Sequence, residues 1–263
     1  MPLITLLTDF GTQDAYVGIM KGVIAQICPD AQVIDLTHQI PPQDLFAARF
    51  NLLNAYPYFP PGTLHVAVVD PGVGTIRRGV VIQTANAFLI GPDNGIFSGI
   101  LQQDPPITAV ALTDSAYWRT PSISTTFHGR DVFSPVAAHL AKGVSIQAMG
   151  ETISLQSLTS LNFPHPVQEG NRIRGSVQYC DRFGNLITNL TPQDLPSAPW
   201  QVRIGQRTLP SAKTYGDLPP GQPLALIGSH GWLEIAINGG NAQEVLQAGI
   251  ETPLWVTPML GKS

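Results

Sequence analysis

In the first half of the chain, the hydrophobic positions predict strands that alternate with helices. Leu3–Thr8 is a run of aliphatic residues and threonines, typical of a strand buried on both faces. Further strands are predicted at Gln32–Leu36, Leu64–Val69, Val80–Gln83, Ala87–Ile90 and Ile107–Ala111, and helices at Asp14–Ile27, Gln43–Ala55, Gly95–Gln102 and Asp131–Ala141. Asp14 lies in the N-cap region of the first helix. Strands that alternate with helices predict an α/β fold whose mainly parallel sheet is covered on both faces.

The pattern changes near Glu151. Short strands punctuated by turn residues then dominate, at Arg172–Cys180, Asn185–Asn189, Gln201–Ile204, Leu224–Ile227, Leu233–Ile237 and Leu254–Thr257. This spacing is typical of a small β-barrel or sandwich. We therefore expect an α/β domain over residues 1–163 and a smaller β domain over residues 170–263.

Composition excludes several classes of protein. The chain has 263 residues, 14 Lys and Arg that form no run, and a net charge of -4, so a nucleic-acid partner is not expected. No stretch approaches the roughly 20 apolar residues of a membrane span. The apolar N-terminal run is short and lacks a basic flank, which predicts a first strand rather than a signal peptide and a cytoplasmic protein. Two distant cysteines, Cys28 and Cys180, predict neither a disulfide framework nor a zinc cluster.

Polar clusters follow the predicted strands at their carboxyl ends, where ligands bind in open parallel sheets. Asp9 and Asp14 follow the first strand, Asp70 and Arg77 the third, and Gly91–Gly95 the fifth. The residue types in each cluster, taken alone, are also those that turns and helix caps require. The glycines after Asp70 have neither the spacing of a dinucleotide fingerprint nor a following lysine, so a nucleoside triphosphate is not expected.

A fourth cluster, Phe127–Asp131, precedes a predicted helix. It contains His128, and Asp131 can cap that helix and so hold the loop in place. A divalent metal held by Asp9, Asp14, Asp70 and His128 is an alternative, because carboxylates and imidazoles bind such ions. However, no pairing such as HxH or DxD supplies two ligands from one element, and no metal is therefore expected.

The β-rich half offers a further set of polar and aromatic residues. Asp181, Phe183 and Asn185 fall in one turn, and Ser229 and His230 in another. An aromatic ring beside an amide suits adenine, which needs a face to stack on and partners for its edge. The alternative is an ordinary hairpin with Phe183 in the core.

Taken together, these segments resemble the S-adenosylmethionine hydroxide adenosyltransferase family, the water-using relatives of fluorinase and chlorinase. The resemblance runs in fixed order through nearly the whole chain, from LLTDFGTQD, VVDPGVGT, GPDNGIFS and FHGRDVFSPVAAHLA to DRFGNLITN and SHGWLEIAINGGNA. It implies an α/β domain, a C-terminal β-barrel domain and a homotrimer. The substrate would then lie between the first domain of one subunit and the second domain of its neighbour.

The resemblance also implies roles for individual residues. Asp9 would hold the ribose hydroxyls, and Asp70, Arg77 and His128 would handle the attacking water. Arg77 is chosen over Arg78 by its spacing from Asp70. The methionine end would face Asp14, Asp181, Ser229 and His230, and the adenosine end would face Phe183, Asn185 and Tyr215.

The expected activity is hydrolysis of S-adenosyl-L-methionine, which is the substrate and needs no cofactor. In the halogenating relatives the positions of Asp70 and His128 hold tyrosines beside a halide, so ionisable residues here favour water. Whether His128 is the base or only positions the water stays open. A halide-using enzyme, a non-catalytic S-adenosylmethionine sensor and a metal-dependent hydrolase are the alternatives.

Overall fold

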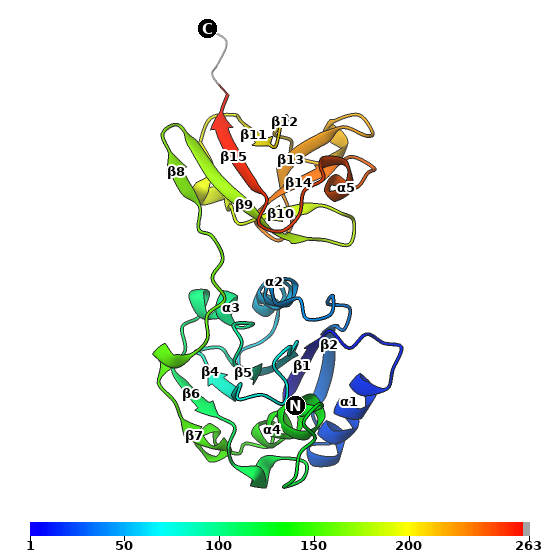
Figure 1. Cartoon of the computed structure of the whole chain (residues 1–263), viewed down its shortest axis with the longest axis vertical. Helices are drawn as coiled ribbons and strands as arrows, with labels where there is room; N and C mark the ends of the chain where they lie inside the picture. Colours follow the sequence, from blue (N-terminus) through cyan, green and yellow to red (C-terminus); the bar gives the residue numbers. More distant parts are fainter. Residues whose placement is uncertain (260–263) are drawn as a thin grey trace. The chain divides into compact units, whose positions relative to one another are not determined.

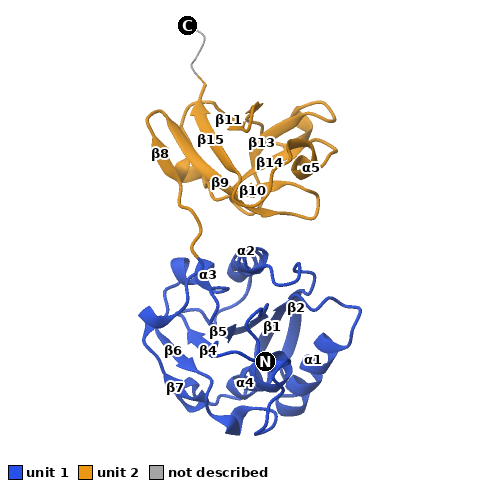
Figure 2. Ribbon diagram, in the orientation of Figure 1, with its two compact units in different colours: residues 1–161 blue, residues 162–263 orange. Residues whose placement is uncertain are grey.

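The computed structural model describes residues 1–259, which form two compact units: residues 1–161, and residues from 162 onward (Figure 2). Unit 1 is a sheet with helices, and unit 2 is almost entirely strands (Figure 1). The predicted α/β class with a β-barrel second part is confirmed. No helix within residues 1–259 is long and apolar enough to cross a membrane.

The sheet of unit 1 has the strand order β2-β1-β3-β5-β4-β6-β7. Its strands are β1 (Leu3–Thr8), β2 (Gln32–Thr37), β3 (Thr63–Val68), β4 (Gly79–Gln83), β5 (Ala87–Pro92), β6 (Thr108–Ala111) and β7 (Glu151–Thr152). β1 and β3 lie inside the sheet, and every residue of β3 is buried. Continuous aliphatic runs are therefore what these two strands need, because both of their faces are covered.

The sheet is mixed. β2, β1, β3 and β5 run parallel, whereas β4, β6 and β7 are each antiparallel to their neighbours. The short connection from Gln83 to Ala87 explains the change, since parallel neighbours require a crossover of about a dozen residues or more. The carboxyl ends of β1, β3 and β5 consequently lie along one edge of the sheet.

Helices cover both faces of this sheet (Figure 1). They are α1 (Tyr16–Ile27), α2 (Leu45–Ala55), α3 (Ser98–Gln103) and α4 (Ser134–Ala141), with short turns η1 (Tyr56–Tyr58), η2 (Ser115–Tyr117), η3 (Gly129–Phe133), η4 (Ile146–Met149) and η5 (Leu155–Ser157). α1 and α4 pack together on β1 and β3 in one core, whereas α2 packs against α3, β1 and β2. Asp44 caps α2 by accepting a hydrogen bond from the Ala47 N–H at 2.9 Å.

Two capping expectations are wrong. Asp14 precedes the N-cap residue of α1, Ala15, and no side chain caps that helix. Asp131 lies inside the π-helical turn η3 rather than at the start of α4. It holds the loop in another way, because its carboxylate accepts from the Arg119 and Arg130 guanidinium groups and from the Ser124 N–H.

Unit 2 is a nearly closed antiparallel barrel with the strand order β12-β11-β15-β9-β10-β14-β13, and β8 pairs with β9. Its elements are β8 (Val167–Glu169), β9 (Arg172–Cys180), β10 (Leu186–Thr188), η6 (Pro192–Asp194), β11 (Trp200–Ile204), β12 (Arg207–Pro210), η7 (Tyr215–Asp217), β13 (Pro223–Ile227), β14 (Leu233–Ile237), α5 (Ala242–Leu246) and β15 (Pro253–Pro258). A bridge between Ser211 and Ala225 brings the two ends of the sheet together. The sequence pattern did not predict β8, β12 and α5.

Candidate active site

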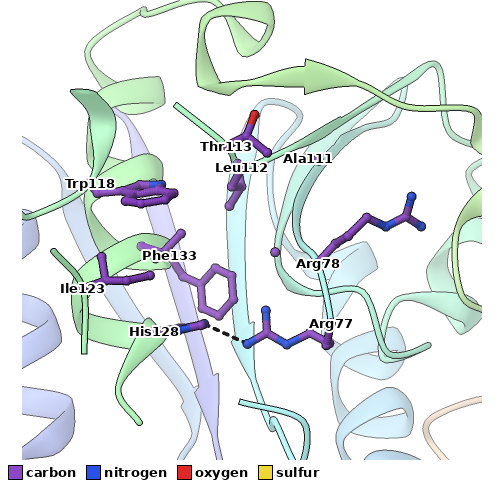
Figure 3. Close-up of a pocket in the computed structure, with 11 residues that line it drawn as sticks. Arg77, Arg78, Ala111, Leu112, Thr113, Trp118, Ile123, His128 and Phe133 are labelled. Atoms are coloured by element: carbon purple, nitrogen blue, oxygen red, sulfur yellow. Dashed lines mark hydrogen bonds between the residues drawn. The ribbon is translucent and has the colours of Figure 1, made fainter. Parts of the chain in front are cut away.

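Three of the predicted site residues meet at the carboxyl edge of the unit 1 sheet. Asp70 lies just beyond β3, Arg77 just before β4, and His128 just before η3. The Arg77 Nε donates to Asp70 Oδ1 at 3.0 Å, and a terminal nitrogen of the same guanidinium pairs with Asp70 Oδ2. That terminal nitrogen also lies 3.0 Å from His128 Nδ1, and Figure 3 marks this contact with a dashed line. One guanidinium therefore joins a carboxylate and an imidazole.

Gly74 allows the loop that carries Asp70 and Arg77 to reach the segment before His128. Its φ is +77°, and a Cβ at this position would lie 2.5 Å from the backbone oxygen of Thr125. Any other residue would be strained by its backbone conformation and by this close approach. The requirement is local and explains why a glycine stands inside the loop.

We expect Gly74→Ala to lower kcat by about 100-fold while the sheet stays folded, since displacing a reacting group by about 1 Å costs that much. Steady-state kinetics and circular dichroism of the variant check this. Gly62→Ala is the matched control: its φ is +87°, but a Cβ there meets nothing within 4 Å. If Gly74→Ala were as active as Gly62→Ala, the loop contact would have no role in catalysis.

Burial and charge act in opposite directions on Asp70. Its side chain is 5% exposed and that of Arg77 is 9% exposed. Burial raises the pKa of Asp70 above its ordinary value, while the charge and hydrogen bonds of Arg77 counteract that rise. The pKa of His128 is lowered, first by burial and then by the positive charge of Arg77. The pKa of Asp70 is thus shifted upward and that of His128 downward, so the two values move closer together.

Phe133 supports the cluster from one side. The Arg77 guanidinium carbon lies 5.6 Å from the centre of its ring, and the His128 ring centre lies 6.5 Å away. Phe133 also lines a cavity of about 220 Å³, shown in Figure 3, in which Arg77 and His128 form part of the wall. The Phe133 ring, which meets His128 edge to face, limits where both side chains can move.

Arg78 has different partners from its neighbour Arg77. It pairs with Asp93 and donates to the backbone oxygen of Ser157 at 2.6 Å. Asp93 also accepts from the Thr159 N–H, so this pair fastens the end of unit 1 to the sheet. The structure therefore joins Arg77, and not Arg78, to Asp70 and His128.

Asp9 and Asp14 lie on the connection from β1 to α1. Asp9 is half-buried and accepts from the Gln43 N–H at 2.8 Å, whereas Asp14 is exposed. Near them Phe10, Tyr16 and Phe127 form a cluster of tilted and edge-on rings, with centres 5.2–5.9 Å apart. Sequence reasoning did not assign Phe10 and Tyr16 to the site; their position within or beside the polar motifs was the available signal.

Unit 2 holds a separate cavity of about 380 Å³, lined by Phe183, Asn185, Tyr215, Ile237, Gly239 and Gly240. Its volume falls in the range of roughly 300–1,000 Å³ that is common for small-molecule sites. Phe183 is 76% exposed, so the alternative that placed it in a hairpin core is wrong. An exposed phenyl ring, a phenol and an amide around a hollow suit a flat heteroaromatic ligand.

Asp181 organises the turn that carries two of these residues. Its Oδ1 accepts from the backbone N–H groups of Phe183 and Asn185, and its Oδ2 accepts from Asn185 Nδ2 at 2.9 Å. The turn also requires Gly184, whose φ is +81°. Asp181 therefore fixes the orientation of the Asn185 amide.

Ser229 and His230 lie in the turn between β13 and β14, where Ser229 is exposed. His230 Nε2 lies 3.0 Å from Glu234 Oε2, and the Tyr215 hydroxyl donates to Glu234 Oε1 at 2.7 Å. Sequence reasoning missed Glu234. In β14 it is the one charged position in a run of apolar residues, and that was the available signal.

A metal centre has no support in the part of the chain that the structure describes. No group of three or more His, Cys, Asp or Glu side chains within residues 1–259 is arranged to hold a metal ion. Asp70 instead uses both of its oxygens for Arg77.

A carboxylate, a guanidinium and an imidazole at the strand ends of an α/β unit are groups that enzymes use to orient and deprotonate a small nucleophile. Comparison with known proteins specifies the class further. Residues 4–150 match the model of the SAM hydroxide adenosyltransferase N-terminal domain, and residues 175–255 match that of its C-terminal domain. The chain belongs to the SAM hydroxide adenosyltransferase family.

Individual relatives agree with this assignment. The chain is 42% identical over 246 residues to an (R)-S-adenosyl-L-methionine hydrolase of Thermus thermophilus, covering 91% of this chain and 93% of that protein. It is 26% identical to a fluorinase of an Actinoplanes species, over 90% of this chain and 91% of the fluorinase. A crystal structure of an uncharacterised conserved protein from Thermotoga maritima matches with a TM-score of 0.90 and 34% identity, covering 97% of this chain and 99% of that one.

Proposed function

We propose that this chain hydrolyses S-adenosyl-L-methionine to adenosine and L-methionine, by attack of water on the ribose 5′-carbon. The observation that carries the proposal is the bonded cluster of Asp70, Arg77 and His128 at the carboxyl end of β3. The hydrolase relative at 42% identity supports the same reaction, and the fluorinase relative is more distant.

Activation of the nucleophile is the demanding part of this reaction. The oxygen of water forms a bond to C5′ as the C5′–S bond breaks, and the electron pair of that bond leaves with sulfur. The sulfonium becomes a neutral thioether, so the leaving group needs no acid. Water must lose one proton, and the site has to orient the oxygen and accept that proton.

The hydrogen bond from Arg77 decides what His128 can do. A guanidinium only donates, so His128 Nδ1 must accept, and the neutral ring carries its proton on Nε2. Nε2–H can donate to a water oxygen but cannot take its proton. We therefore infer that His128 positions the water rather than acting as the base.

Asp70 is then the proton acceptor. Arg77 donates to both carboxylate oxygens and the Gly72 backbone donates to the same carboxylate, which leaves one of its roughly four lone pairs for a water proton. Burial raises the pKa of Asp70, which brings a carboxylate closer to the basicity that proton transfer needs. Reaction of an incipient hydroxide with a sulfonium cation destroys charge, so a dry site favours it over bulk water.

The remaining predicted residues bind the substrate. Asp9 holds the ribose hydroxyls, and its position beside the aromatic cluster at the end of β1 supports this role. Phe183, Asn185 and Tyr215 face the adenosine end, which the cavity in unit 2 supports. Asp14, Asp181, Ser229 and His230 face the methionine end. No cofactor takes part.

A homotrimer with each site at a subunit interface is part of the proposal, because the catalytic cluster and the aromatic cavity belong to different units. Light scattering measures the mass. Mixing Asp70→Asn with Phe183→Ala subunits and allowing them to reassemble should restore part of the activity that each variant lacks. A monomer of full activity would contradict this arrangement. The cytoplasmic location stays a prediction, which cell fractionation can check.

Incubation of the purified protein with S-adenosyl-L-methionine, followed by chromatography, tests the activity directly. Equimolar adenosine and methionine are expected, with the rate unchanged in excess chelator and in chloride. Formation of 5′-chloroadenosine instead would identify a halide-using enzyme. Tight binding without product would identify a sensor, and loss of activity in chelator would identify a metal-dependent hydrolase.

The configuration at sulfur is a finer part of the same proposal. A sulfonium centre is pyramidal, so S-adenosyl-L-methionine exists as two diastereomers, and the name of the Thermus thermophilus relative specifies the (R) form. We expect the (R) form to be consumed first from a mixture of both. Chromatography that separates the diastereomers during turnover measures this, and equal consumption would contradict it.

The pH dependence follows from the two shifted groups. The active form has Asp70 ionised and His128 neutral, so acidification removes activity by protonating either group. Because the pKa of Asp70 is raised and that of His128 is lowered, activity is expected at neutral pH and should fall on acidification, at a pH above the ordinary pKa of an aspartate. Profiles of kcat/KM from acid to neutral pH test this, with circular dichroism to separate unfolding. Activity that does not fall on acidification of the folded protein would contradict the assignment of roles.

A further inference from the structure

Glu234 is a buried charge that the proposed reaction does not use. It lies on β14, its residue is 3% exposed, and the other four residues of that strand are apolar and buried. A carboxylate in such surroundings is costly unless its oxygens are hydrogen-bonded. Its two bonds, to Tyr215 and His230, are therefore what makes the position tolerable.

The hydrogen bonds also fix the protonation pattern of His230. The backbone N–H of Trp232 donates to His230 Nδ1 at 3.1 Å, so Nδ1 accepts and the neutral ring carries its proton on Nε2. Nε2 then donates to Glu234 Oε2. The imidazole is thus oriented at both nitrogens, and Glu234 supplies one of the two contacts.

Tyr215 depends on the same carboxylate. Its hydroxyl donates to Glu234 Oε1, and burial together with Glu234 raises the pKa of Tyr215 to about 12. Tyr215 is 45% exposed and lines the cavity in unit 2. A half-exposed ring gains a fixed orientation when its hydroxyl is anchored beneath the surface.

Gly228 leaves the space in which this arrangement forms. A Cβ at Gly228 would lie 2.5 Å from His230 Nε2 and 2.6 Å from Glu234 Oε2. The backbone, imidazole and carboxylate therefore pack without room for a methyl group. The contact between His230 and Glu234 is built into the turn between β13 and β14.

We propose that Glu234 is a positioning residue for substrate binding, which holds Tyr215 and His230 in fixed orientations through its two carboxylate oxygens. The inference rests on the proposed function, in which Tyr215 faces the adenosine end of the substrate and His230 the methionine end. The buried Glu234 carboxylate then orients side chains that contact both the adenosine and the methionine end of the substrate. Because Glu234 belongs to unit 2, it affects binding and leaves the cluster of Asp70, Arg77 and His128 intact.

Comparison of Glu234→Ala, Glu234→Gln and the control Glu251→Gln tests this proposal. Glu251 is also in unit 2 but exposed, so its variant removes the same charge without the buried contacts. Glu234→Ala should raise KM and the dissociation constant for adenosine by about tenfold or more, the usual effect of orphaning buried donors. Its kcat should change by less than about threefold, since the loss is in binding rather than in the chemical step.

Glu234→Gln should recover most of the affinity. Its amide oxygen can accept from His230, and its amide nitrogen can donate to the Tyr215 oxygen. NMR of the His230 ring supplies a readout independent of turnover. Trp232 keeps the proton on Nε2 in every variant, but this proton is held by Glu234 and should exchange with water faster in Glu234→Ala than in the native protein and Glu234→Gln. Unchanged KM and unchanged exchange of the Nε2 proton in a folded Glu234→Ala variant would overturn the proposal.

Tyr215→Phe keeps the test decisive if Glu234→Ala fails to fold, because it removes one contact and leaves the carboxylate bonded to His230. Calorimetry should then show weaker adenosine binding with unchanged methionine binding. An equal loss of affinity for adenosine and for methionine would overturn the separate roles of Tyr215 and His230. If the native protein formed no adenosine from S-adenosyl-L-methionine, the proposed function would fail, whereas the proton-exchange and product-binding measurements would still decide the role of Glu234.

Discussion

Asp70→Asn should lower kcat by about 10²–10⁴-fold, the usual contribution of a positioned general base. Asparagine has the size of aspartate and keeps an oxygen that can accept from Arg77, but its amide takes no proton from water. KM should change little, because Asp70 acts on the nucleophile and not on the adenosine or methionine groups. Single-turnover kinetics, with calorimetric measurement of substrate affinity, separate the two effects.

Asp93→Asn is the matched control. Asp93 is another buried carboxylate paired with an arginine in the same unit, and its partner is Arg78. The Asp93→Asn variant should have a lower free energy of unfolding, but the folded protein should not show a comparable loss of kcat. If Asp70→Asn retained more than about a tenth of native kcat, Asp70 would not be the base.

Arg77→Met should both inactivate and destabilise the protein. It leaves the Asp70 carboxylate, which is 5% exposed, without its counter-charge. Removal of one partner of a buried ion pair costs about 3–5 kcal/mol. The unpaired carboxyl would then take up a proton and lose its function as a base, while His128 would lose the donor that fixes its tautomer. Chemical denaturation and kinetics measure both losses.

A double variant distinguishes stability from catalysis. Arg77→Met combined with Asp70→Asn removes both charges and should recover part of the lost stability, because no uncompensated charge remains buried. The activity of the double variant should stay at the level of the less active single variant. Arg78→Met provides a comparison. The Arg78 side chain is 36% exposed, so this variant should lose less stability than Arg77→Met. Recovery of activity in the double variant would contradict the assigned roles.

The sequence predicted much of the site because its chemistry follows strand ends. Asp70 comes directly after an aliphatic strand, and parallel strands bring their carboxyl ends to one edge. The choice of Arg77 over Arg78 agrees with the hydrogen bonds, although spacing alone contains no information about which guanidinium turns toward Asp70. The roles of these residues in turnover stay predictions.

Other features depend on tertiary contacts that a linear pattern does not contain. Asp131 has the residue type and position of a helix cap, yet two guanidinium groups and the Ser124 N–H recruit it into a π-helical turn. Glu234 looks like a polar interruption of a strand until Tyr215 and His230 are brought to it. β12 was missed because its pairing with β11 across a tight turn, rather than its own alternation, defines it.

The adjacent arginines of the sequence Arg77-Arg78-Gly79 affect how other sequences should be annotated. Arg77 bonds to Asp70 and His128 and is the arginine proposed for catalysis, whereas Arg78 pairs with Asp93, so an alignment shifted by one position would transfer the proposed role to the wrong residue. Gly79 offers a fixed reference, because a Cβ there would lie 3.0 Å from the Phe133 ring. In any homologue, the arginine to compare with Arg77 is the one two positions before that glycine.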